Sequence, residues 1–275
     1  MVEKEIRFRQ KRELAQILSE ALEFFKQEYR AILRMVAIYV LPFLVLNAGA
    51  QVYFQKNVLV NLDFTDPEAL MADLGALNLN LFFLLLFGLF VQSLLVGTYY
   101  SYLEAYIKLG KGNFQLSDIS SNFFSNSLLA LGAGLVFTFA SLFGLMLCVL
   151  PGIFLANTLS LMFFITVFEK QGIAYSTTKS WLLVRTQWWN TLAMNALGII
   201  AWYSVHLIFS LLLFVLGFAG GFNTSVTEGP INYPQWYWIL IGVSSAVSTI
   251  FMIIPYTLQA FQYFNLEERE NPKAV

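Results

Sequence analysis

Cysteine, histidine and charge are scarce in this sequence of 275 residues. Its single cysteine, Cys148, lies in an apolar stretch, so the chain cannot form an intrachain disulfide or a paired-thiol metal site. The single histidine, His206, cannot supply the two or three ligands that zinc enzymes use. Charged residues make up 12% of the chain, against about 25% in soluble globular proteins. The sequence therefore predicts neither a metal site nor another cofactor.

Catalytic motifs are also missing. All four aspartates fall in predicted loops, so no pair of aspartates lies at membrane depth to carry out proteolysis: Asp63, Asp66, Asp73 and Asp118. The sequence contains neither His-Glu-x-x-His nor Gly-x-Ser-x-Gly, and no acid lies near His206 in the sequence to complete a serine triad. We expect a non-enzymatic protein with no catalytic residue and no nucleic-acid partner.

Long apolar blocks dominate the rest of the chain, which is 58% hydrophobic with a mean hydropathy of +0.65. Each block reaches the roughly 18 to 20 residues that cross about 30 Å of hydrocarbon. The blocks are apolar on all sides rather than alternating, which favours helices over the strands of a membrane barrel. The predicted fold is an all-α, polytopic membrane protein with about six transmembrane helices. They cover residues 34–54, 79–103, 127–149, 152–168, 189–216 and 236–263.

The leader, residues 1–33, combines charge with a helical apolar pattern. Its apolar side chains recur every three or four positions, which predicts an amphipathic helix: Leu14, Ile17, Leu18, Ala21, Leu22, Phe25 and Tyr29. We favour a placement in the plane of the membrane. The alternative is a helix packed on the protein's own cytoplasmic loops. In the first outer loop, Pro67 to Leu74 predicts a short helix that ends at Gly75.

A charge-free run from Ser127 to Phe168 is long enough for two spans. Pro151-Gly152 predicts the reversal between them, which makes the third and fourth spans a hairpin. Residues 171–188 then predict an amphipathic connection at the membrane interface.

Basic residues are distributed unevenly over this topology. With six spans, every lysine and arginine except Lys56 falls on one side. The positive-inside rule then places both termini, including the tail 264–275, in the cytoplasm. The outer loops hold Asp63, Asp66, Glu68, Asp73 and Glu228. The Asn223-Thr224-Ser225 glycosylation pattern in the last outer loop is interpreted as accidental.

A few polar residues lie at predicted membrane depth. The candidate cluster comprises Gln92, Asn157, His206, Ser244 and Ser248, with Asn195, Ser204 and Ser245 as further polar groups. One hypothesis is that they line a substrate cavity; the other is that each hydrogen-bonds between helices, which contributes about 0.6 to 2 kcal/mol. No carboxylate or amine lies near the middle of a predicted span, which disfavours ion coupling.

The segment from Pro151 to Leu192 contains a recognisable pattern. A Pro-Gly pair opens a span, a glutamate closes it, and a glycine, a serine and a basic residue precede an aromatic: Pro151, Gly152, Glu169, Gly172, Ser180, Arg185 and Trp188. This pattern resembles a bacterial family of six-helix inner-membrane proteins similar to the membrane domain attached to some glycerophosphoryl diester phosphodiesterases. The resemblance implies a six-helix bundle but no phosphodiesterase activity, because the catalytic domain is absent. We interpret the pattern as structural, with Glu169 pairing with Lys179 or Arg185.

Two functional hypotheses follow. The first is an integral membrane scaffold or accessory subunit that binds membrane-protein partners, a second copy of itself, or lipids of the bilayer, through its N-terminal helix and cytoplasmic surface. The second is a transport or lipid-handling protein whose cavity lies among the polar residues at membrane depth.

Overall fold

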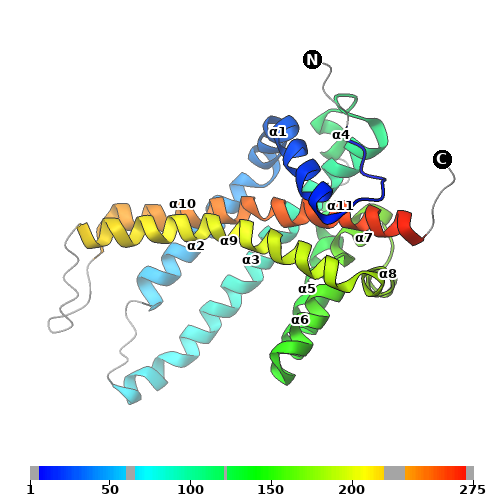
Figure 1. Ribbon diagram of the computed structural model, residues 1–275. Helices are drawn as coiled ribbons and strands as arrows, with labels where there is room; N and C mark the ends of the chain where they lie inside the picture. The colour runs from blue at the N-terminus through cyan, green and yellow to red at the C-terminus, as the bar shows by residue number, and fades with distance from the viewer. Residues whose placement is uncertain (1–5, 60–65, 121–122, 220–232, 271–275) are drawn as a thin grey trace. The chain divides into compact units, whose positions relative to one another are not determined.

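The computed structural model describes residues 6–59, 66–120, 123–219 and 233–270 (Figure 1). The regular structure in these ranges is entirely helical, which confirms the all-α prediction. The chain forms two compact units. Unit 1 comprises Met1–Val40, Gln92–Ala201 and Met252–Val275, and unit 2 comprises Leu41–Val91 and Trp202–Phe251.

Twelve helical elements lie in the described ranges. They are α1 (Leu14–Tyr39), α2 (Leu41–Phe54), the π-helix η1 (Gln55–Leu59), α3 (Pro67–Leu109), α4 (Leu116–Ser120), α5 (Phe123–Leu147), α6 (Val149–Thr158), α7 (Met162–Glu169), α8 (Ile173–Thr186), α9 (Trp188–Ala219), α10 (Gln235–Phe251) and α11 (Ile253–Glu270).

Five helical segments of the described chain are long and apolar enough to cross a membrane. They are Asp73–Leu109, Phe123–Leu147, Val149–Glu169, Trp188–Leu216 and Gln235–Glu270. A sixth is added if the broken pair Leu14–Tyr39 and Leu41–Leu59 counts as one span. The chain is therefore a multi-pass membrane protein.

The first predicted span, residues 34–54, is divided between two helices. α1 continues through the predicted amphipathic segment to Tyr39, and α2 begins at Leu41. Pro42 lies in the first turn of α2, where a backbone N–H is not needed for the helix. In the interior of one continuous helix from α1, the same proline would remove a hydrogen bond and interrupt the helix. The leader helix and the start of the predicted span are therefore one element.

The helix is amphipathic as predicted, but its buried face differs from the predicted one: Ile17 and Ala21 are buried together with Phe24, which the predicted pattern omits, whereas Leu22 and Tyr29 are exposed. Phe24 on this face is fully buried and meets Tyr106 of α3 edge to face, with ring centroids 5.2 Å apart. Phe8, which precedes the helix, stacks on Phe261 of α11 at 4.3 Å. This face thus packs on the protein's own helices, as in the alternative placement, although its contacts are with α3 and α11 rather than loops. Leu22 remains 63% exposed on another side of α1.

The predicted hairpin of the third and fourth spans is present as α5 and α6, which lie side by side (Figure 1). The reversal falls at Cys148, whose backbone is extended, rather than at Pro151-Gly152, which lie in the first turn of α6. Gly152 instead permits close helix packing. A Cβ added at Gly144 would lie 2.9 Å from the Gly152 Cα.

One predicted boundary is wrong. The helix that begins at Pro67 does not stop at Gly75 but continues through the second span to Leu109. Glycine ends a helix only where a left-handed cap is needed, and an apolar segment in lipid satisfies its backbone groups by remaining helical.

Several predicted features lie outside the described residues. These are Asp63, Glu228, the Asn223-Thr224-Ser225 pattern, residues 1–5 of the leader and residues 271–275 of the tail. Of the tail predicted from residue 264, the part up to Glu270 belongs to α11, and Phe264 and Leu266 are fully buried.

Gly97 provides a test of the packing of α3 on α5. A Cβ at Gly97 would lie 2.4 Å from the backbone nitrogen of Ser127, so one helix backbone must shift. We expect Gly97→Ala to lower the free energy of unfolding by about 1–3 kcal/mol, a typical cost of overpacking. The measurement is thermal unfolding in mild detergent.

Gly88→Ala is the matched control, because it lies on the same helix and its Cβ would meet no heavy atom within 4 Å. The control should be neutral or stabilising by up to about 1 kcal/mol. Equal stability of the two variants would contradict the close approach of α3 and α5.

Candidate functional site

The polar residues predicted at membrane depth do not share one cluster within either unit. Gln92 and Asn157 belong to unit 1, whereas His206, Ser244 and Ser248 belong to unit 2. Gln92 donates from Nε2 to the Tyr256 hydroxyl of α11, which is an interhelical hydrogen bond of the expected kind. Asn157, in contrast, bonds to Trp188 and Asn195, so Gln92 and Asn157 have different hydrogen-bond partners.

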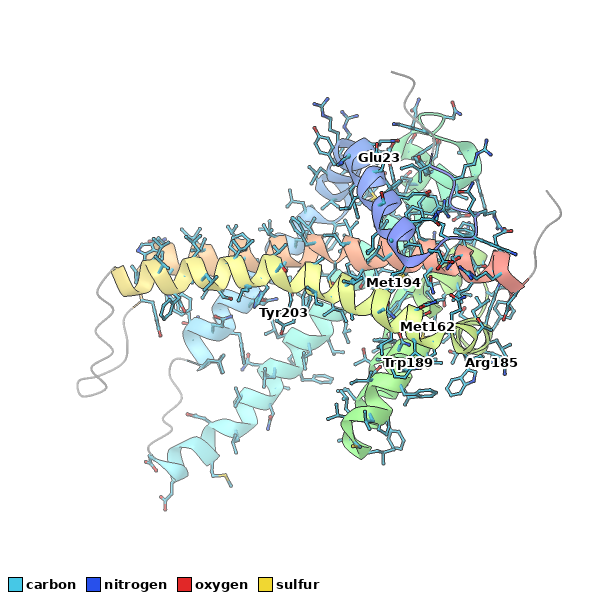
Figure 2. All side chains as sticks on the ribbon, viewed as in Figure 1. Glu23, Met162, Arg185, Trp189, Met194 and Tyr203 are labelled. Carbon is cyan, nitrogen blue, oxygen red and sulfur yellow. The ribbon has the colours of Figure 1, made fainter. Side chains whose placement is uncertain are left out.

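In unit 2, the three candidates have different surroundings. His206 is exposed, and its ring lies 6.1 Å from that of Tyr203. Tyr203 lies on α9 (Figure 2). Ser244 and Ser248 are buried on α10, and the Ser248 carbonyl accepts a hydrogen bond from Trp202 Nε1 at 2.7 Å. This contact joins α9 to α10 through the backbone of Ser248, whereas the Ser248 hydroxyl is buried without a hydrogen-bond partner among the described residues.

The segment that contains Asn157 is a broken helix. α6 ends at Thr158 and α7 begins at Met162, near the middle of the apolar segment Val149–Glu169. The intervening backbone makes tight turns, in which Ser160 N donates to Asn157 O at 3.3 Å. Leu159, Ser160 and Leu161 are all buried, as non-helical backbone at membrane depth requires.

A cavity of about 330 Å³ lies beside this break. Its lining comes from α5, α6, the break itself, α9 and α11 and is mostly apolar: Phe137, Ile153, Ala156, Asn157, Ser160, Leu192, Asn195, Ala196, Ile199, Pro255 and Gln259. None of these described lining residues is ionisable. We call this space the amide cavity, because three of its four polar side chains carry an amide.

Hydrogen bonding inside the amide cavity is incomplete. Asn195 Nδ2 donates to Asn157 Oδ1 at 2.9 Å, and Asn157 Nδ2 donates to the Trp188 carbonyl at 3.1 Å. Asn195 Oδ1 and the 4%-exposed Ser160 hydroxyl are buried without a hydrogen-bond partner in the structure. A buried polar atom without a partner costs about 1–3 kcal/mol, so both atoms favour a ligand that bonds to them.

Two residues of the family-like pattern hold the end of α6 in place. Ser180 Oγ donates to the Thr158 carbonyl at 2.7 Å, and Trp188 Nε1 donates to the Thr158 hydroxyl at 3.2 Å. The backbone carbonyl freed at the helix break is thereby satisfied from α8. The pattern residues Ser180 and Trp188 therefore border the amide cavity from outside.

The predicted pairing of Glu169 is found with Lys179, at 2.6 Å. Lys179 Nζ also lies 3.3 Å from Glu267 of α11, and the Tyr263 hydroxyl lies within hydrogen-bond distance of both carboxylates. Arg185, the other proposed partner, is exposed on α8 and forms no ion pair with a described residue (Figure 2).

Opposing effects act on the Lys179 ammonium. Burial lowers its pKa, but the hydrogen bond from Nζ to Glu169 and the charges of Glu169 and Glu267 outweigh burial and raise the pKa above 10.5. Lys179 is therefore charged at neutral pH and joins α7, α8 and α11.

Sequence reasoning selected Asn157 but not Ser160 or Gln259. The signal for Ser160 was available, since Asn157, Thr158 and Ser160 form a polar group within an otherwise apolar block. Gln259 carried no comparable signal, because it lies close to the predicted membrane interface.

These features define an all-α, multi-pass membrane protein with an uncharged cavity beside a broken helix. No family model, curated protein or solved structure matches the chain. Within the described residues, no group of three or more histidine, cysteine, aspartate or glutamate side chains is arranged to hold a metal ion.

We expect Lys179→Met to destabilise the protein by about 1.5–3 kcal/mol at pH 7, because it leaves two carboxylates together without their cation. Since the folded-state pKa of Lys179 is raised, its contribution is complete below the unfolded value of 10.5 and is lost as the pH rises through the folded-state pKa. Thermal unfolding at pH 7, 9 and 11 measures this difference.

Arg185→Met removes the same charge from the same helix and is the control, expected within about 0.5 kcal/mol of the parent protein. A difference between Lys179→Met and the parent that stays constant up to pH 11 would argue against the electrostatic explanation.

Proposed function

We propose that this protein binds a neutral, hydrogen-bonding lipid or similar amphiphile in the amide cavity, as part of a transport or lipid-handling function without chemical conversion. The observation that carries this proposal is the pair of buried, unpartnered polar atoms, Ser160 Oγ and Asn195 Oδ1, that the cavity contains. The cavity volume of about 330 Å³ lies at the small end of the usual range for ligand sites.

The lining defines the chemistry of the ligand. Asn195 Oδ1 accepts a hydrogen bond and the Ser160 hydroxyl donates or accepts one, so the ligand carries a hydroxyl or amide N–H donor. A charged group is disfavoured, because no described lining residue compensates a charge in this largely apolar space. The apolar wall, formed by residues such as Ile153 and Ile199, suits a hydrocarbon chain.

The scaffold hypothesis has a narrower basis than the sequence suggested. The N-terminal helix uses its main apolar face within unit 1, where Ile17, Ala21 and Phe24 are buried. What remains for a partner is an exposed stripe with Leu22, Tyr29 and Leu33, beside the basic residues Lys26, Arg30 and Arg34. A deletion of residues 1–30 would also remove these core residues, so loss of partner binding in that variant would not distinguish a lost interface from a destabilised fold.

We also propose that the chain is a bacterial inner-membrane protein of the six-helix family that it resembles, with both termini in the cytoplasm. The basic residues support this orientation, since only Lys56 departs from one side of the predicted topology.

Asn57 and Asn113 provide a matched test of the orientation. Both are exposed, and each caps the carbonyl four residues earlier. In a Cys148→Ser background, we expect a membrane-impermeant maleimide to label Asn57→Cys in intact cells and Asn113→Cys only after lysis. The reverse pattern would refute cytoplasmic termini.

For the amide cavity, we expect the protein to retain one defined neutral amphiphile after mild extraction, and Asn195→Leu to weaken its binding about tenfold. This factor corresponds to about 1.4 kcal/mol, the size of one lost hydrogen bond. Native mass spectrometry, with identification of the released molecule, measures the occupancy.

Asn190→Leu is the control, because Asn190 lies on α9 as Asn195 does but is exposed, and its side chain donates to Gln187 Oε1. Retention of the same amphiphile by Asn195→Leu and the control would rule out the amide cavity as its site. A stoichiometric protein partner with no bound amphiphile would favour the scaffold hypothesis instead.

A further inference from the structure

Unit 2 contains a groove of about 680 Å³ between α2 and α10. Its sides are apolar and include Val45, Val52 and Val243. Gly49 lines the groove, and a Cβ added at this position would meet no other heavy atom within 4 Å, so the groove is open here. We call this space the α2–α10 groove.

One end of the α2–α10 groove carries a positive charge. Lys56, in η1 directly after α2, lines the groove and is exposed. It is the basic residue that departs from the predicted cytoplasmic distribution. Within the described part of the chain, no carboxylate forms an ion pair with Lys56.

Aromatic side chains lie at the same end. Gly242 of α10 faces Ala48 and Val52 of α2. Beyond this point the groove lining extends to Lys56 after α2 and to Tyr233 before α10, which fits two helices that run in opposite directions. Tyr233 and Trp238 line this end of the groove, with ring centroids 5.5 Å apart. Amphipathic aromatic rings of this kind favour the level of the lipid headgroups.

The cation and the aromatic rings lie at one end of an apolar groove, so the groove matches an amphiphile with an anionic headgroup followed by an apolar chain. We propose that the α2–α10 groove binds one anionic phospholipid, with its phosphate at Lys56 and an acyl chain along Gly49 and Gly242. The lipid comes from the bilayer itself, so no route through water is needed. This site uses none of the residues of the amide cavity, and either site stands if the other fails.

Two variants separate the headgroup contact from the acyl-chain contact. Lys56→Gln removes the charge and leaves the groove open, whereas Gly49→Phe fills the groove and leaves the charge. Gly88→Phe is the control for the added ring, because Gly88 belongs to unit 2, has no heavy atom within 4 Å of its Cβ position, and does not line the groove. The probes are phosphatidylglycerol and phosphatidylcholine with identical acyl chains.

Native mass spectrometry of the full chain, titrated with each lipid, measures binding of the first molecule. We expect the parent protein and Gly88→Phe to prefer phosphatidylglycerol about fivefold, the effect of one lysine near an anionic headgroup. Lys56→Gln should bind both lipids alike, and Gly49→Phe should bind both at least tenfold more weakly.

Equal binding of the two lipids by the parent protein would overturn the proposal, as would an unchanged preference in Lys56→Gln. A homodimer that dissociates in Gly49→Phe without loss of bound lipid would also overturn it, because a second copy of the chain would then be the occupant.

Discussion

The structure of unit 1 depends on the neutralisation of ionic groups where the C-terminal half of α11 is buried. This helix carries Phe261, Phe264 and Leu266 inside the unit, and the charged residues that follow them, Glu267 to Arg269, are only partly exposed to water. Glu267 meets Lys179 at 3.3 Å and Arg9 at 3.1 Å, and Arg269 bonds to the Arg12 carbonyl at 2.8 Å. Because these groups are only partly exposed, removal of one partner leaves a partly desolvated charge without its counter-charge. These ion pairs and hydrogen bonds therefore hold the N-terminal segment, α7 and α8 to α11, in addition to the apolar contacts.

The same pairing positions the amide cavity. Lys179 and Ser180 are consecutive on α8: the first reaches Glu169 at the end of α7, and the second reaches the Thr158 carbonyl at the end of α6. These two contacts span the broken segment, so α8 connects the ends of α6 and α7 on either side of the break. A break without such a connection would leave free backbone carbonyls in an apolar environment, at several kcal/mol each. The ion pair and the serine together permit Ser160 to remain non-helical beside the cavity.

The sequence predicted those features that depend on local composition. The helices, the hairpin and the Glu169–Lys179 pair follow from apolar length, the absence of charge over residues 127–168 and the spacing of opposite charges. The break at residues 159–161 could not be predicted, because it contains neither glycine nor proline and the group that satisfies the Thr158 carbonyl is the hydroxyl of Ser180, which is distant in the sequence. The contacts of α1 were ambiguous for a similar reason, since burial against α3, α11 or lipid requires the same periodicity.

The two recesses differ in the electrostatic condition that they impose on a ligand. In the amide cavity, the described lining offers only neutral donors and acceptors, so an uncharged ligand is favoured in this apolar space. At the α2–α10 groove, Lys56 is exposed, and an anion pairs with it while keeping part of its hydration. A headgroup that satisfies one recess therefore fails in the other. A phosphate is too costly to dehydrate for the first, and a neutral hydroxyl gains little from the second. In the proposed sites, selectivity between amphiphiles would therefore depend on the position of Lys56 at the α2–α10 groove and on the uncharged amides of the amide cavity.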